Sequence, residues 1–197
     1  DHAPMKRSAP FLLLAIALFL QISSRGQNPV NGYAQVTAIA GNTLTVTNVN
    51  EAYDTFEDGE EVIVMQMQDN VAGTNTANNS TFGDISGIGN AGRWEIRVIA
   101  SHTESLGVPA TVTLTTAMAY PYSTCAQCRV QLITRPTFGA PNWTTTAPIN
   151  ALAWNGSIGG VVAFRVPGTL TVGHDILANG RGFRGGAPSA NFTGACN

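Results

Sequence analysis

Six carboxylates lie within the eleven residues from Glu51 to Glu61 and form the densest polar cluster of the sequence. Hard cations such as Ca²⁺ take roughly six to eight oxygen ligands, and extracellular modules bind calcium weakly. Candidate ligands are Asp54, Glu57, Asp58 and Glu60. Their spacing matches neither the EF-hand loop nor the nonapeptide calcium repeat. Because runs of charge are usually solvated, we expect a loop that keeps the protein soluble, with a calcium-stabilised binding module as the alternative.

Cys125 and Cys128 form a C-x-x-C motif, and Cys196 lies one residue from the end of the sequence. In an exported chain such a pair is best interpreted as a structural disulfide. A thioredoxin-like redox pair belongs at a helix N-terminus in a βαβ unit, whereas Thr-rich strand sequence flanks this motif. A zinc site would need two more ligands, and the sequence has no second C-x-x-C and no H-x₃-H. We therefore predict a disulfide between Cys125 and Cys128.

Catalytic groups are sparse. A Ser-His-Asp site needs three groups within hydrogen-bond reach, but His174 and Asp175 are neighbours on one predicted strand and point to opposite faces. His102 is the other histidine beyond residue 26, and no G-x-S-x-G motif is present. Glu95 and Glu104 could be imagined as glycosidase carboxylates, yet the pattern around residue 95 places Glu95 on the solvent face of a strand. We expect no catalytic residue and no bound cofactor apart from the calcium considered above.

Glycine-rich and aromatic turns mark the C-terminal part. Residues 180–186 could bind an anion, but a phosphate loop needs a helix after its glycines, and residues 187–190 offer none. Glycines that allow positive φ and close stacking explain the pattern better, with Phe183 in a core position. Sugars could stack on Trp94, Trp143 and Trp154, although burial in a core is the expectation for each. The predicted structural turn residues are Trp154, Gly156, Gly159, Gly160, Gly182, Phe183, Gly185 and Gly186.

The N-terminal segment has the layout of a secretory signal. Lys6 and Arg7 precede an apolar run over residues 11–20, and Ser24 and Gly26 fit the small −3 and −1 positions before a cleavage site. A membrane-spanning helix needs about 20 apolar residues, and this run is shorter. We expect residues 1–26 to comprise four upstream residues and a signal peptide that starts at Met5. The mature chain would begin at Gln27, be secreted or displayed on the outer cell surface, and have no transmembrane segment.

Charge restricts the function classes further. Only 11% of the residues are charged, less than half of the roughly 25% found in an average domain. The formal net charge is −2, which argues against a nucleic-acid binder held by phosphate contacts. Removal of residues 1–26 leaves seven Arg, eleven Asp and Glu, and no Lys. Lysine Schiff-base chemistry is therefore excluded within the mature residues.

Short alternating segments predict an all-β fold. Residues 35–40 and 43–47 flank Gly41-Asn42 and predict a hairpin. Further strands are expected at residues 61–67, 94–100, 110–115 and 129–134. The order of the first three strands recurs about sixty residues later, which indicates a weak two-fold repeat. Two such units can close into one small barrel or sandwich, and we assign residues 27–140 to this cap domain.

Beyond a Pro-rich stretch at residues 136–148, which resembles a linker or edge crossing, the rhythm changes. Short strands are predicted at residues 161–166, 169–172 and 175–178, each followed by Gly or Pro-Gly. Such spacing fits the first rungs of a β-solenoid of the right-handed β-helix type. Because each rung must stack on the next, residues 141–197 are expected to be a linker and the start of a solenoid, truncated here from a longer protein.

Three segments carry a family resemblance. They are Trp-Asn-Gly-Ser-x-Gly-Gly at residues 154–160 with the apolar run after it, Gly-Arg-Gly-Phe-Arg-Gly-Gly at 180–186, and residues 58–68. With them, most of residues 30–190 resembles the N-terminal region of very large adhesin-like or gliding-associated surface proteins of Gram-negative bacteria, often exported by the type IX secretion system. Members commonly have Gly-Asp where this chain has Gly59-Glu60. The resemblance implies an extracellular role and supplies no catalytic residue.

Together these features predict a non-enzymatic structural or adhesion protein that is secreted or held at the cell surface. Its partners would be surface glycans or other cell-surface proteins, and nucleic acid is not expected among them. The alternative is the non-catalytic N-terminal part of a secreted carbohydrate-active β-helix enzyme whose site lies beyond residue 197.

Overall fold

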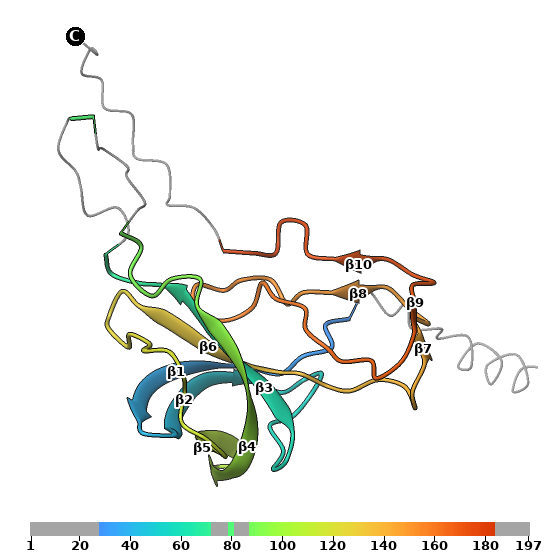
Figure 1. The fold of residues 1–197 in the computed structure, drawn as a ribbon, viewed down its shortest axis with the longest axis horizontal. Helices are drawn as coiled ribbons and strands as arrows, with labels where there is room; N and C mark the ends of the chain where they lie inside the picture. Colours follow the sequence, from blue (N-terminus) through green and yellow to red (C-terminus); the bar gives the residue numbers. More distant parts are fainter. Residues whose placement is uncertain (1–27, 72–78, 81–86, 184–197) are drawn as a thin grey trace, which may run out of the picture.

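The computed structural model describes residues 28–71, 79–80 and 87–183, and within them every regular element is a β-strand. The fold is therefore all-β, as predicted (Figure 1). The six longer strands are β1 (Tyr33–Ala40), β2 (Thr43–Asn50), β3 (Glu61–Gln68), β4 (Trp94–Ser105), β5 (Val108–Leu114) and β6 (Arg129–Thr134). The four short ones are β7 (Trp143–Thr144), β8 (Ile149–Asn150), β9 (Leu170–Thr171) and β10 (Ile176–Leu177).

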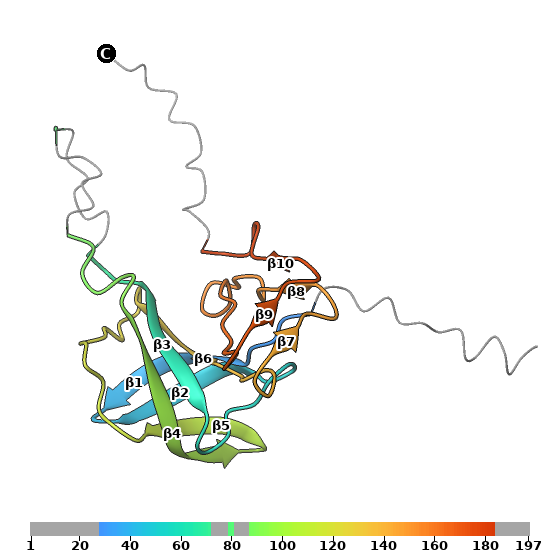
Figure 2. The same ribbon diagram turned by 45° about the vertical axis from the view of Figure 1, so that its right-hand side comes forward.

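Strands β1 to β6 close into an antiparallel barrel in the order β1-β2-β5-β4-β3-β6 (Figure 2). The predicted hairpin of β1 and β2 turns at Gly41, which has a φ of 64°, a value that glycine adopts without steric cost. Of the two architectures considered from the sequence, barrel and sandwich, the molecule adopts the barrel. Closure leaves none of these six strands as an open edge.

The strand order has an internal two-fold symmetry. Exchanging each of β1, β2 and β3 with the strand three places later in the chain leaves every neighbouring pair in the barrel unchanged. The exchanged strands are those that the predicted sequence repeat pairs. Each unit also has a long loop before its third strand, and both loops lend side chains to the barrel core: Phe56 from one, and Met118 and Tyr122 from the other.

Alternation along the strands fills the barrel interior with aliphatic side chains. The cluster is Ala34, Val36, Leu44, Val46, Phe56, Val62, Val64, Ile99, Val112, Leu114, Val130 and Leu132, each at most 3% exposed. Burying such side chains is the main stabilising contribution to the barrel, at about 1.5–3 kcal/mol for a fully buried Val, Leu or Ile.

A second, smaller core lies on the outside of the barrel wall. Tyr33, Ile133 and Ile158 are buried there, and Ile63, Met65, Leu152 and Val161 pack against them. Residues 152–161 therefore cover the outer face of β1, β6 and β3. This cover explains why strand β6 is buried on both faces, with only its first residue partly exposed.

The chain after the barrel forms a parallel stack. Strand β7 pairs with β9 in the register Trp143 to Leu170, and β8 pairs with β10 in the register Ile149 to Ile176, so both offsets are 27 residues. An isolated bridge joins Thr137 to Arg165 in the same sense. The stretch at residues 136–148, expected as a linker, thus pairs regularly with later residues. The strand predicted at residues 161–166 was wrong, because the segment is irregular except for the bridge at Arg165.

Candidate functional site

The most concentrated set of buried charge lies at one end of the barrel, around Glu95. Glu95 is opposite Val64 in the β3–β4 register and shares its inward face. It is 6% exposed, while its neighbour Trp94 is 54% exposed. The prediction that Glu95 faces solvent, with Trp94 in the core, was therefore wrong. Apolar residues on both sides of Glu95 suggested the opposite alternation, but here the strand directs its acid inward to meet a loop.

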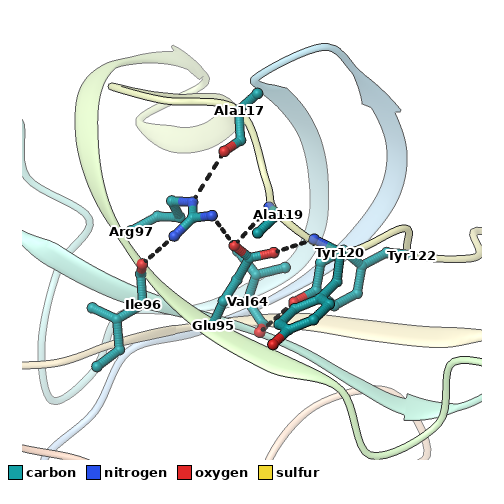
Figure 3. A network of polar contacts seen from close by, with 8 residues as sticks. All are labelled: Val64, Glu95, Ile96, Arg97, Ala117, Ala119, Tyr120 and Tyr122. Carbon is teal, nitrogen blue, oxygen red and sulfur yellow. Dashed lines mark hydrogen bonds and ion pairs between the residues drawn. The ribbon is translucent and has the colours of Figure 1, made fainter.

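Glu95 binds backbone and guanidinium donors together (Figure 3). Its carboxylate accepts the amide hydrogens of Ala119 at 2.9 Å and Tyr120 at 3.3 Å. It also pairs with Arg97, two residues along the same face of β4. Arg97 in turn donates to the carbonyl oxygens of Ala117 at 3.2 Å and Ile96 at 2.8 Å. The pair therefore fixes the loop before β6 across the end of the barrel.

Tyr122 completes this network from the loop itself. Its hydroxyl donates to the carbonyl oxygen of Val64 at 3.4 Å, and its ring packs against the barrel core. Burial, and then the nearby Glu95 carboxylate, raise the pKa of Tyr122 far above its usual value. A phenol that stays protonated beside a carboxylate already holding three donors suits a structural network. Proton transfer to a substrate would require the carboxylate to be free.

The acidic loop disperses its carboxylates among separate partners. Glu51 accepts the amide hydrogen of Phe56 at 2.8 Å, and Glu61 pairs with Arg135. Of the calcium candidates, Glu57, Asp58 and Glu60 are exposed and Asp54 is half-buried. Within the described residues, no group of three or more His, Cys, Asp or Glu side chains is arranged to hold a metal ion. The loop geometry therefore adds no support to the calcium alternative.

His102 lies between two carboxylates at the far end of β4. Its Nδ1 is 2.7 Å from Asp58 Oδ1, and its Nε2 is 3.8 Å from Glu104 Oε1. The hydrogen bond with Asp58 raises the pKa of His102 above its usual value. Both ring nitrogens thus face acids, which stabilises imidazolium and leaves neither nitrogen placed as a base for a nucleophile. His174 is exposed and bonds through its backbone to Thr145.

Cys125 and Cys128 form a disulfide in the turn before β6. Beside it, Asp69 at the end of β3 is a buried carboxylate that the sequence reading did not single out. Its oxygens accept the amide hydrogens of Asn70 and Asn90 at 2.7 Å and the hydroxyl of Ser123 at 3.1 Å. Asp69 therefore ties the loop that carries the disulfide to two other segments of the barrel.

Three buried amide side chains each hold a loop residue through both backbone groups. Gln131 donates to the carbonyl oxygen of Gly159 at 3.1 Å and accepts its amide hydrogen at 2.9 Å. Asn31 binds the amide and carbonyl of Ala163 in the same way, and Gln66 those of Ser123. The sequence reading missed these residues. A signal exists for Gln66, which follows Val62 and Val64 at the period-two spacing of the core face.

The predicted turn residues occupy the stacked segment. Gly156, Gly159 and Gly160 have positive φ values, and a Cβ on Gly160 would lie 3.0 Å from the Cα of Gly182. Trp154 is buried, as expected, and its ring centroid is 5.6 Å from that of Phe183. Phe183 itself is 49% exposed, so its expected core position was wrong. Gly185 and Gly186 lie outside the described residues.

The three tryptophans do not form one platform. Trp143 stacks on Phe138 with centroids 4.4 Å apart and meets Phe164 edge-on at 5.5 Å. Trp94 lies instead on the barrel wall beside an apolar hollow of about 220 Å³. Its lining is Ile63, Met65, Trp94, Val161, Val162 and Ala163, so it offers sugars few polar partners.

Comparison with known proteins adds no relative. No protein-family model matches the chain, and no significant match was found among curated proteins or among solved structures. In the part of the chain that the structure describes, no helix is long and apolar enough to cross a membrane.

Proposed function

We propose that this chain is a non-enzymatic structural protein of the bacterial exterior, in which the barrel caps the first coils of a β-solenoid. The observation that carries the proposal is the constant parallel offset after the barrel. The N–H groups of Trp143, Thr145, Ile149 and Ala151 each donate to a carbonyl oxygen 26 residues later. A repeat of fixed length whose copies pair in parallel is the defining geometry of a solenoid.

The stack has a layer on its barrel side as well. Asn28 bridges Ile149 in parallel, and the amide of Asn150 donates to the carbonyl oxygen of Asn28 at 3.2 Å. Asn28, Ile149 and Ile176 thus mark three successive layers. The barrel is inserted in the chain between the first and the second of these layers, and so it lies where a cap must lie to cover the starting end of a solenoid.

The barrel is bonded to the coil rather than tethered by a linker. Gln131 and Asn31 bind the backbone of Gly159 and Ala163, and the outer core around Tyr33 and Ile158 buries apolar surface between the two parts. Terminal caps keep a solenoid soluble because an open sheet edge invites pairing with other molecules. Covering that edge is the task we assign to the barrel.

The exterior location is supported by the leader at residues 5–26, the disulfide and the family resemblance. We propose a secreted or surface-held scaffold that displays or spaces adhesive parts, with surface glycans or cell-surface proteins as partners. No catalytic role is assigned, because the buried acid Glu95 is engaged by the barrel loop and by Arg97.

A duplication within the coil tests the solenoid. One variant repeats residues 146–172, adding one 27-residue period, and a control repeats a segment of half that length. If the coil is a solenoid, the full-period insertion adds one rung, because its strands pair in the same register. The protein should then unfold cooperatively with an unchanged or higher midpoint, with added strand signal in circular dichroism.

The half-period control should lose the register and lower the midpoint. Equal behaviour of the two insertions, or an added segment that stays unfolded in both, would contradict the proposal. The carbohydrate-active alternative is separated by incubating the same proteins with polysaccharides, since release of sugar from any of them would show a catalytic site within this chain.

A further inference from the structure

The two sulfurs of the disulfide have different surroundings. Cys125 is partly exposed, whereas Cys128 is 4% exposed. Cys125 lines a surface hollow of about 390 Å³ between the barrel and residue 157. An incoming group can therefore reach Cys125 from solvent, while the barrel shields Cys128.

Cys128 lies against a buried anion. Its Sγ is 3.5 Å from Oδ1 of Asp69, which is itself 5% exposed. Burial alone would raise the pKa of Asp69, but hydrogen bonds from Asn90, Asn70 and Ser123 hold that pKa below its usual value. The Asp69 carboxylate is thus charged at neutral pH, and one of its oxygens faces the buried sulfur.

We propose that this disulfide is a thiol-exchange site of fixed polarity, at which a small external thiol attacks Cys125 and releases Cys128 toward Asp69. In this step the thiolate sulfur bonds to Cys125 Sγ while the Cys125–Cys128 bond breaks. The electron pair of that bond leaves on Cys128, which takes a proton from water. The products are a mixed disulfide on Cys125 and a free Cys128 thiol, so no further oxidant or reductant is needed.

The lining of the hollow indicates the class of thiol. Gln35, Thr37, Thr124 and Ser157 supply polar groups, and Arg129 supplies a positive charge. Arg129 is held in place because it donates to the carbonyl oxygens of Gly156, Ala126 and Cys128 at 2.7–2.9 Å. A positive charge beside hydroxyl and amide groups suits a small polar thiol that carries carboxylates, of which glutathione is a convenient probe.

Asp69 lengthens the life of the adduct. A carboxylate beside a buried thiol disfavours the thiolate and accepts a hydrogen bond from the protonated form. Cys128 therefore stays protonated after its release and attacks the mixed disulfide slowly. The same effect makes Cys128 a poor leaving group, so the adduct forms slowly and then persists.

The test uses the intact chain with Cys196→Ser, so that only the paired cysteines react. Folded protein is incubated with excess reduced glutathione, quenched with acid, and mapped by peptide mass spectrometry. We expect the adduct on Cys125 with Cys128 free. An adduct on Cys128, an even distribution, or labelling only after denaturation would overturn the proposal.

Asp69→Asn should speed both formation and loss of the adduct by roughly threefold to tenfold, since a thiol pKa lower by one unit gives more thiolate of slightly lower nucleophilicity. Ser123→Ala is the matched control, because it removes one bond to Asp69 but keeps the carboxylate, and its rates should equal those of the parent. Should Asp69→Asn fail to fold, the pH dependence of adduct loss in the parent decides instead. It should give Cys128 a pKa above about 8.5, the ordinary thiol value, and a value at or below this contradicts the role of Asp69. None of these outcomes bears on the coil, so failure here leaves the proposed scaffold function standing.

Discussion

Glu95 shows how much one inward-facing charge contributes at the residue scale. Replacing Glu95 by Ala leaves Arg97 without its carboxylate and the amides of Ala119 and Tyr120 without their acceptor. We expect the free energy of unfolding to fall by about 3 kcal/mol, the lower end of the cost of breaking a buried ion pair. Glu104→Ala, on the exposed end of the same strand, should cost about 0.5 kcal/mol or less. Urea denaturation measures both, and equal losses would show that Glu95 is not the anchor of the loop.

Tyr33 makes the stability depend on alkaline pH. Burial raises the pKa of Tyr33 from its usual 10.0 to about 12. Above pH 10 the unfolded chain loses the phenolic proton while the folded chain keeps it, so ionisation favours unfolding. Stability from this group is complete below pH 10 and falls by roughly 1.4 kcal/mol per pH unit up to about pH 12.

Tyr33→Phe removes that share of the pH dependence together with the hydrogen bond to the Val161 carbonyl. Its unfolding free energy should therefore fall less steeply from pH 10 to 12 than that of the parent, although it starts lower. Denaturant titrations at pH 9, 10, 11 and 12 give both slopes. Parallel slopes would mean that another group carries the alkaline transition.

At the scale of elements, the join between β6 and the coil depends on an amide side chain. Gln131→Ala leaves the buried amide and carbonyl of Gly159 unpaired, and each unpaired group costs about 1–3 kcal/mol. We expect a loss of about 2–4 kcal/mol in total. Gln127→Ala, which removes the same amide from an exposed turn, should have little effect. A neutral Gln131→Ala would mean that apolar contacts alone hold the coil.

The barrel strands were predictable because their chemistry is local. Alternating β-branched residues on both sides of Gly41-Asn42 give β1 and β2, and apolar runs give β3, β5 and β6. The orientation of β4 at Glu95 was not, because an acid between two apolar residues looks solvent-facing until a loop 24 residues away supplies its donors. The coil pairing at residues 137–148 was also missed, since two-residue strands have no readable period and their partners lie about 27 residues away.

At the scale of the whole molecule, export should leave a defined N-terminus. When the full chain is expressed in a Gram-negative host, we expect cleavage after Gly26, because Ser24 and Gly26 are the small residues that a signal peptidase selects. Intact-mass and N-terminal peptide analysis of the exported protein should show Gln27 first. Gly26→Leu should impair cleavage, whereas Arg25→Gln should not. An exported chain that retains residues 5–26 would contradict the assignment of this segment as a signal.

Hydrogen exchange measured by NMR tests the coil stack most directly. If residues 137–154 and 165–181 pair as successive coils, the amides of Trp143, Thr145, Ile149 and Ala151 are hydrogen-bonded to the next layer. They should then exchange at least about a hundredfold more slowly than an unstructured peptide, the protection expected of a bonded strand in a packed region. Fast exchange at these four amides, with protection confined to β1–β6, would show that the barrel stands alone and caps nothing.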